Sequence, residues 1–448
     1  MIGHAAVYTV SNVLTAAIPF LLLPILTRVL TPAEYGTVAM FGIAVSMLGA
    51  FTGLSVQGAV SIRYFDQENI NLSCYVASCL SILIVSTVIV FSLIFLFRSN
   101  LEKLTEVPQG WLLIAVLVSG MQFIILLRLY LWQVSKQPRK FGGLQITQSA
   151  LNAGLSVWLV IVIGLGWRGR TSAIVIATFV VMVIAVSSLW RDKWIKFPVS
   201  LAYVKDALKF GVPLIPHTLG GMLISMVDRI IVTKLLGVAE TGIYTVALQV
   251  GMVLGFVTNS INQAYAPWLF ERLKQRDQTQ EIVIVRYTYL YFLVLSGLAL
   301  LIGLSAPTIL SIIAGKAFRG GSGVVIYIAM GFAFGGMYYM VTNYIFFESA
   351  TGKLAFITLF AGVVNVIVTY LLVMKYGIAG AGRGFMISQA ILFLGTWLLA
   401  HKVHPMPWRM ALQSASWAKA AGRPPFWRGA PKPDDADKDS KKIESKQA

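Results

Sequence analysis

The sequence predicts an all-α integral membrane protein with about 12 transmembrane helices in two pseudo-symmetric six-helix lobes. Three observations lead to this prediction. The chain is 57% hydrophobic and 12% charged, with a mean hydropathy of +0.77, which is too apolar for a soluble protein of 448 residues. It contains about 12 apolar stretches of membrane-spanning length, and its two halves share a repeated motif.

Each candidate span holds roughly 20 apolar residues, enough at about 1.5 Å per residue to cross about 30 Å of hydrocarbon. In chain order the spans lie near 5–26, 37–60, 76–97, 111–134, 144–165, 171–190, 212–236, 243–266, 284–304, 322–346, 355–374 and 380–400. We interpret the first as a retained helix because no basic region precedes it. Six spans in each half insert in the same direction, which predicts a pseudo-twofold axis along the membrane normal.

The expected organisation has four parts. An N-terminal lobe covers 1–190, a cytoplasmic linker 191–211 and a C-terminal lobe 212–404, followed by a basic, disordered cytoplasmic tail over 405–448. Near the start of this tail, Trp408 and Trp417 together with Arg409 and Lys419 fit a short amphipathic segment lying on the membrane surface.

The repeat is a shared T-[RK]-x-L-x-x-A-E-x-G pattern, in which Thr27–Gly36 returns 206 residues later as Thr233–Gly242. A second set follows at an offset of 213, in which Asn152, Gly164 and Arg170 correspond to Asn365, Gly377 and Arg383. In the first copy, Thr31 to Glu34 read as a capping box with Pro32 at the first helical position. This pattern predicts that the second helix starts there.

Lys and Arg are more numerous in the loops on one side, which predicts cytoplasmic termini in a bacterial inner membrane. Basic inner loops and a basic tail beside anionic lipid also account for the net charge of +18. We therefore expect membrane lipids as partners and no nucleic acid. The two cysteines and four histidines form no metal-binding pattern, so no cofactor or metal is expected.

Charged residues inside the spans are the candidate substrate-binding and translocation residues, because a charge in the membrane centre costs at least about 2.5 kcal/mol. The set comprises Arg28, Arg128, Asp228, Arg229, Lys234, Arg286 and Arg383. Asp228 and Arg229 lie near mid-membrane, where an interhelical ion pair is the alternative to a substrate role. For Arg28, Lys234, Arg128 and Arg286 the alternative is a side chain that extends to the interface. The excess of arginine favours an anionic substrate headgroup, since guanidinium groups suit phosphate oxygens.

The chain resembles the polysaccharide-export flippases of the O-antigen (Wzx) type, in the multidrug/oligosaccharidyl-lipid/polysaccharide (MOP) superfamily. The resemblance covers about residues 5 to 400 and depends on the string from Leu23 to Gly36, on Asp228 to Gly237 with Gly242-Ile243-Tyr244, and on Asn365 with Tyr376 to Ala381. It implies a two-lobed MATE/MOP-like fold of 12 helices. It also implies alternating-access transport of an undecaprenyl-diphosphate-linked oligosaccharide for surface polysaccharide synthesis, with a polysaccharide polymerase as a candidate partner.

By position, Arg28, Asp228, Arg229 and Lys234 match motif positions of this family. Arg128 and Arg286 depend on their depth in the membrane alone, and Arg383 departs from the small residue usual after the Gly-Ala turn. Three alternatives remain. A multidrug (MATE) antiporter would be expected to carry more buried carboxylates, and a membrane polymerase, ligase or glycosyltransferase would need a large periplasmic loop. A lipid II flippase resembles a chain with two further C-terminal helices. We therefore expect a transporter that is not an enzyme.

Overall fold

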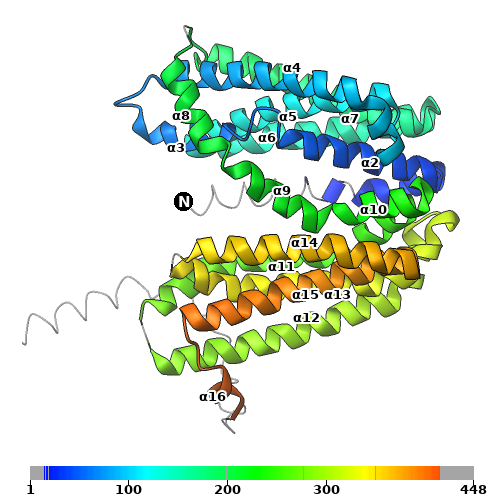
Figure 1. The fold of residues 1–448 in the computed structure, drawn as a ribbon, viewed down its shortest axis with the longest axis vertical. Coiled ribbons are helices and arrows are strands. Elements are labelled where there is room, and N and C mark those ends of the chain that lie inside the picture. Colours follow the sequence, from blue (N-terminus) through cyan, green and yellow to red (C-terminus); the bar gives the residue numbers. More distant parts are fainter. Residues whose placement is uncertain are drawn as a thin grey trace, which may run out of the picture.

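The computed structural model describes residues 20–413 except 198, 276 and 349, together with Thr15, Ala17 and Ile18. In this part of the chain every regular element is a helix. Figure 1 shows two bundles side by side, the first half of the chain in blue to green and the second in green to orange. Ten of the described helices are long and apolar enough to cross a membrane, and the apolar helix Phe20–Val29 is a shorter one. The predicted all-α, two-lobed membrane fold is confirmed.

The N-terminal lobe begins with the helix Phe20–Val29. It continues with α2 (Pro32–Gly49), α3 (Gln57–Arg63), the 3-10 turn η1 (Tyr64–Asp66), α4 (Leu72–Thr105), α5 (Gln109–Val134), α6 (Pro138–Val157), the π-helical turn η2 (Trp158–Val162) and α7 (Gly166–Arg191). Helix α5 packs against α2, α4 and α7 and forms the centre of this lobe.

The second half comprises α8 (Leu201–Gly211), α9 (Leu214–Ser225), α10 (Val227–Leu236), α11 (Val238–Leu273), α12 (Gln278–Ile313), the 3-10 turn η3 (Lys316–Gly321), α13 (Ser322–Phe347), α14 (Thr351–Tyr376), α15 (Ile378–Val403) and the short α16 (Trp408–Gln413). Helix α13 packs against α11, α12 and α15 and forms the core of the C-terminal lobe.

The start of α2 is the predicted capping box. The Glu34 amide donates to the Thr31 hydroxyl at 3.3 Å, and the Thr31 amide donates to the Glu34 carboxylate at 2.9 Å. Pro32 occupies the first turn, where its missing N–H costs nothing.

The expected single helix over 37–60 is wrong, because the chain turns between α2 and α3. Gly53, Leu54 and Ser55 all have positive φ, and a Cβ on Gly53 would lie 2.2 Å from the Phe123 ring. The Gly53 amide donates to the Ser86 hydroxyl on α4 at 2.8 Å. Neighbouring helices thus satisfy a backbone break inside an apolar stretch.

The predicted span over 212–236 is also interrupted, at Met226 between α9 and α10. Asn365 on α14 supports the interruption, since its amide nitrogen donates to the carbonyl oxygens of Leu223 at 2.9 Å and Ile224 at 3.3 Å. Helices α9 and α10 both pack against α14, so this broken helix belongs to the C-terminal lobe.

Helix α8, in the segment expected to be a linker, docks tightly on the N-terminal lobe. Asp206 accepts hydrogen bonds from Arg63 at 2.6 and 3.0 Å and from Tyr75 at 2.9 Å. The hydrogen bonds to Asp206 and Asp66 raise the pKa of the Arg63 guanidinium above its ordinary value. A Cβ on Gly211 would lie 2.3 Å from the Leu54 carbonyl oxygen. The connection between lobes is therefore short and lies between Gly211 and Leu214.

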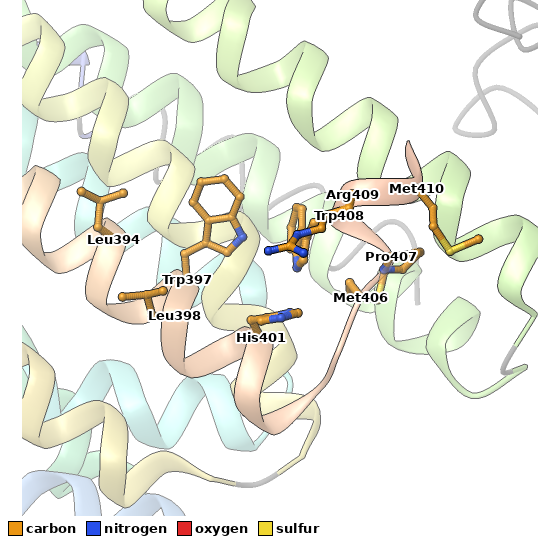
Figure 2. Close-up of a pocket in the computed structure, with 9 residues that line it drawn as sticks. All are labelled: Leu394, Trp397, Leu398, His401, Met406, Pro407, Trp408, Arg409 and Met410. Carbon is orange, nitrogen blue, oxygen red and sulfur yellow. The ribbon is translucent and has the colours of Figure 1, made fainter. Parts of the chain in front are cut away.

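In the described part of the predicted surface segment, helix α16, Trp408 points into the C-terminal lobe instead of lying on a surface. Trp417, Lys419 and the rest of the predicted tail lie outside the described residues. Trp408 is only 8% exposed, and its ring packs against Tyr289, Tyr344 and Trp397 at centroid distances of 5.2 to 6.3 Å. Figure 2 shows Trp397 and Trp408 beside a pocket of about 800 Å³ between α15 and α16. The C-terminal lobe thus extends through residue 413.

Replacing Trp408 with alanine should lower the free energy of unfolding by about 3–5 kcal/mol, because it removes a buried aromatic side chain. Thermal melting of the purified protein in detergent tests this. Met410→Ala is the matched control on the same short helix, since Met410 is 48% exposed. Equal melting temperatures for the two variants would mean that α16 adds nothing to the lobe.

Candidate functional site

The repeated motif builds the seam between the lobes. A Cβ on Gly36 of α2 would lie 1.9 Å from the Val238 carbonyl oxygen on α11, and a Cβ on Gly242 would lie 1.9 Å from the Pro32 carbonyl oxygen. At the repeat offset of 206, Pro32 corresponds to Val238 and Gly36 to Gly242, so each contact is the symmetry mate of the other. Only glycine permits backbones to approach this closely.

The helix Phe20–Val29 extends the seam from the N-terminal side. Leu22, Leu23 and Leu26 are buried in one hydrophobic cluster with residues of α10, α11, α12 and α13. At its end the Gly315 amide donates to the Thr27 hydroxyl at 3.2 Å, and Arg28 donates to the Ile312 carbonyl oxygen at 3.1 Å. The first helix is therefore held by the opposite lobe.

Tyr35 crosses the same seam. Its hydroxyl donates to the side-chain oxygen of Gln249 on α11 at 3.0 Å, and its ring meets Phe318 edge-on at 5.5 Å. A fourth inter-lobe hydrogen bond joins the Val238 amide to Glu106 at 3.4 Å. Among the described residues, all side-chain hydrogen bonds between 20–211 and 212–413 involve residues at or near the repeated motif or the loop before η3.

Asp228 and Arg229 lie in the first turn of α10, two and three residues after the interruption at Met226. Asp228 is 1% exposed and accepts a hydrogen bond of 2.5 Å from the Tyr244 hydroxyl on α11. Arg229 is partly buried, approaches the Asp228 carboxylate at 3.5 Å and donates to the Ser225 carbonyl oxygen. Asp228 therefore faces the neighbouring helix, and Arg229 covers the end of α9.

Arg28 and Lys234, which correspond to each other in the repeat, are both exposed. They flank the seam from opposite lobes, each just before the start of α2 or α11. The Thr233 and Thr241 hydroxyls hydrogen-bond at 2.7 Å across the turn that separates Lys234 from α11.

Arg128 is engaged inside the N-terminal lobe. Its guanidinium donates to Ser188 at 2.9 Å, pairs with Asp192 at the end of α7 and lies 4.3 Å from the centre of the Trp132 ring. Its charge is thus already compensated in this conformation.

Arg286 and Arg383 lie at opposite ends of the C-terminal lobe, about two turns into α12 and one turn into α15. Arg286 is 9% exposed, and its Nε has no hydrogen-bond partner among the described residues. Arg383 lies 4.3 Å and 5.0 Å from the ring centres of Tyr376 and Tyr327 and donates to the Tyr327 hydroxyl at 3.2 Å. The structure therefore brings together Asp228 with Arg229, but it leaves Arg128, Arg286 and Arg383 apart.

Two polar contributors were missed in the sequence, Tyr244 and Gln249. Both are polar residues inside an apolar span, which is a usable signal, but their partners on other elements cannot be read from periodicity. The described residues contain no group of three His, Cys, Asp or Glu residues arranged to hold a metal ion. The exposed cations at the seam, Arg28 and Lys234, have the charge and the donors that suit anionic groups.

Comparison with known proteins agrees with this geometry. Residues 3–273 match the family model described as polysaccharide biosynthesis protein. The capsular polysaccharide biosynthesis protein CapF of Staphylococcus aureus is 23% identical over 417 residues, covering 86% of this chain and 95% of that protein.

Two solved structures share the fold. The lipid II flippase MurJ in an inward closed conformation superposes with a TM-score of 0.70 at 14% identity, covering 92% of this chain and 89% of that one. An inward-facing multidrug resistance MATE family transporter of the MOP superfamily gives 0.65 at 15% identity, with 91% and 96% covered. The predicted resemblance to a polysaccharide-export family is confirmed by the family match, and the predicted MATE/MOP-like fold is confirmed by these two structures.

Gly36→Ala should move the lobes apart at the seam and cost about 1–3 kcal/mol, because the new methyl group would overlap the Val238 carbonyl. Spin labels at the exposed positions Ser99 and Ala317, in a background without Cys74 and Cys79, report the separation by double electron–electron resonance. Gly42→Ala on the same helix is the control, since a methyl group added there would meet nothing within 4 Å. An unchanged distance distribution in Gly36→Ala would argue against a tight seam.

Tyr244→Phe should lower the free energy of unfolding by about 1–3 kcal/mol, because it leaves the buried Asp228 carboxylate without its hydroxyl donor. Thermal melting measures the loss. Tyr370→Phe, on a tyrosine that is 45% exposed, removes the same atom and should have little effect. If both variants melt like the wild type, Asp228 does not depend on this contact.

Proposed function

The chain belongs to the polysaccharide biosynthesis protein family, and we propose that it is a flippase that carries an undecaprenyl-diphosphate-linked oligosaccharide across the bacterial inner membrane. The observation that supports this best is the seam. Two duplicated lobes touch through reciprocal glycine contacts near one end of their helices, an arrangement in which a rocking motion can open one side while closing the other. Flipping requires such motion and no covalent chemistry.

The direction of opening follows from the charge bias of the loops. If the side richer in Lys and Arg is cytoplasmic, the seam lies at the periplasmic side. The four inter-lobe hydrogen bonds then close the outside, and this conformation is the one that admits substrate from the cytoplasmic leaflet. Both termini are cytoplasmic on this proposal.

The proposed cargo is anionic at its diphosphate. Arg28 and Lys234 flank the seam with exposed side chains, and Arg229 lies five residues before Lys234 on α10. These three are the best-placed contacts for the headgroup. Arg286 has an unpartnered Nε at the other end of the C-terminal lobe and suits an entry contact. A phosphate at Arg128 would have to compete with Asp192, and one at Arg383 with two aromatic rings.

Membrane potential can supply part of the driving force. With a negative cytoplasm, each negative charge moved outward gains about 2.3 kcal/mol per 100 mV. A polysaccharide polymerase on the outer side is the class of enzyme that would consume the product, and it is the proposed partner.

Deletion of the gene in its native host should cause full-length lipid-linked repeat units to accumulate on the cytoplasmic side and surface polysaccharide to disappear. Complementation with the wild-type gene should restore both. The double variant Arg28→Gln/Lys234→Gln should lower flipping at least about a hundredfold, since each charge-assisted hydrogen bond contributes about 1.5–3 kcal/mol. Extraction and sidedness assays of the lipid-linked glycan measure the result.

Arg98→Gln is the control, because the Arg98 guanidinium stacks 4.2 Å from the Phe95 ring of its own helix, α4, and has no hydrogen bond or ion pair among the described residues. Unchanged surface glycan together with new drug sensitivity after deletion would reject the flippase assignment and favour a multidrug antiporter of the same fold.

A further inference from the structure

An unassigned polar site lies in the hairpin formed by α6, η2 and α7. After Val157 the helix widens into a π-helical turn, and the chain reverses through Gly164 and Gly166, which have φ of 77° and 56°. Such π-helical insertions occur frequently at functional sites. The reversal brings Arg170 on α7 against the polar residues of α6.

Arg170 has neutral partners only. Its Nη1 donates to the Ser156 hydroxyl at 2.8 Å and to the side-chain oxygen of Asn152. Among the described residues it forms no ion pair, and no partner is found for its Nε, its Nη2 or the Asn152 amide nitrogen. Residues 1–14 contain no Asp or Glu that would supply a counter-ion.

A cation placed among neutral groups inside a lobe is unusual, because a charge removed from water is normally paired. Arg128 in the same lobe follows the rule through Asp192. Arg170 is partly buried and does not, so the site holds positive charge and unfilled donors that an oxyanion would satisfy.

The site borders the seam. Ala153, about one turn before Ser156, and Val157, the next residue after it, pack against the hydrophobic cluster that joins the two lobes. Arg170 lies within electrostatic reach of Tyr35, the residue that crosses to Gln249. It is also only one turn from the start of α7, where the Trp167 amide donates to Glu34 of α2 at 3.4 Å.

The repeat provides an internal comparison. At the offset of 213, Asn365, Thr369 and Arg383 correspond to Asn152, Ser156 and Arg170. In the C-terminal lobe the Asn365 amide is used by the Leu223 and Ile224 carbonyls, its oxygen accepts from Thr369 and Ser388, and Arg383 turns away to two tyrosines. The equivalent position in that lobe is therefore filled, whereas the N-terminal copy keeps its donors free.

We propose that Arg170, with Asn152, forms an oxyanion site at the closed end of the seam that receives a phosphate group of the lipid-diphosphate substrate. This inference depends on the proposed flippase function for the identity of the ligand. The planar guanidinium fork suits two phosphate oxygens, and the Asn152 amide supplies a third donor.

The test measures binding to the purified full-length protein in detergent. Inorganic pyrophosphate at constant ionic strength should raise the melting temperature of the wild type, and the apparent Kd should weaken at least about tenfold in Arg170→Gln. Arg170→Lys, which keeps the charge but loses the fork, should bind with intermediate affinity and remains informative if Arg170→Gln does not fold. The matched control is Arg168→Gln, because Arg168 is exposed two residues away on α7.

A second arm separates the sources of phosphate. Undecaprenyl diphosphate should displace pyrophosphate from the wild type. Pyrophosphate binding that this lipid cannot displace would assign the site to a free oxyanion and overturn the headgroup assignment. Equal pyrophosphate affinity in Arg170→Gln and Arg168→Gln would overturn the proposed Arg170 site. That result would not bear on the proposed flippase function. If the wild-type protein binds pyrophosphate through Arg170 but does not transport the lipid-linked glycan, the flippase function is rejected and the oxyanion site stands.

Discussion

The two lobes depend on a backbone contact that only glycine allows. Gly36 lets α2 approach the carbonyl group of Val238, and Gly242 lets α11 approach that of Pro32, so one element of the repeat makes the same contact twice. The capping box at Thr31 sets where α2 begins, and Gly237, with φ of 93°, sets where α11 begins. Gly36 and Gly242 can lie against each other only when both helices, α2 and α11, begin at these residues. Tyr35 and the first helix then add side-chain contacts to a geometry that the backbone has already determined.

Several charges within the spans have local partners. Arg128 is paired with Asp192 and Arg383 lies against two aromatic rings, whereas Arg286 keeps an Nε without a partner among the described residues. Asp228 is compensated by Tyr244 on the helix that forms the seam, which ties the broken α10 to α11. The cations with unfilled donors include Lys234 and Arg170, both near the seam. Because an unpaired charge is costly in a membrane, these two cations are the groups that the proposed anionic headgroup would stabilise.

Much of this could be predicted from the sequence, since hydropathy and the repeat depend on local composition. The order of the spans, the capping box and the two-lobed fold follow from such patterns. The breaks at Gly53 and Met226 do not, because they are stabilised by Ser86, Phe123 and Asn365, which lie on other helices and far away in the chain. The predicted spans end at 165 and resume at 171, so the sequence alone places Arg170 in an outer loop. Its true environment depends on Asn152, 18 residues earlier, which only the hairpin geometry brings into contact.

The duplication is also informative where the copies differ. The same asparagine supports a broken helix in one lobe, through Leu223 and Ile224, and holds an arginine in the other. The two uses draw on different atoms of the amide group. In the C-terminal lobe the Asn365 nitrogen donates to the broken helix, and its oxygen is occupied by Thr369 and Ser388. In the N-terminal lobe the Asn152 oxygen accepts from Arg170, and its nitrogen is left available to an anion. If the headgroup is bound by the N-terminal lobe at the closed end, the C-terminal lobe with its broken helix is left as the part that can adjust around it.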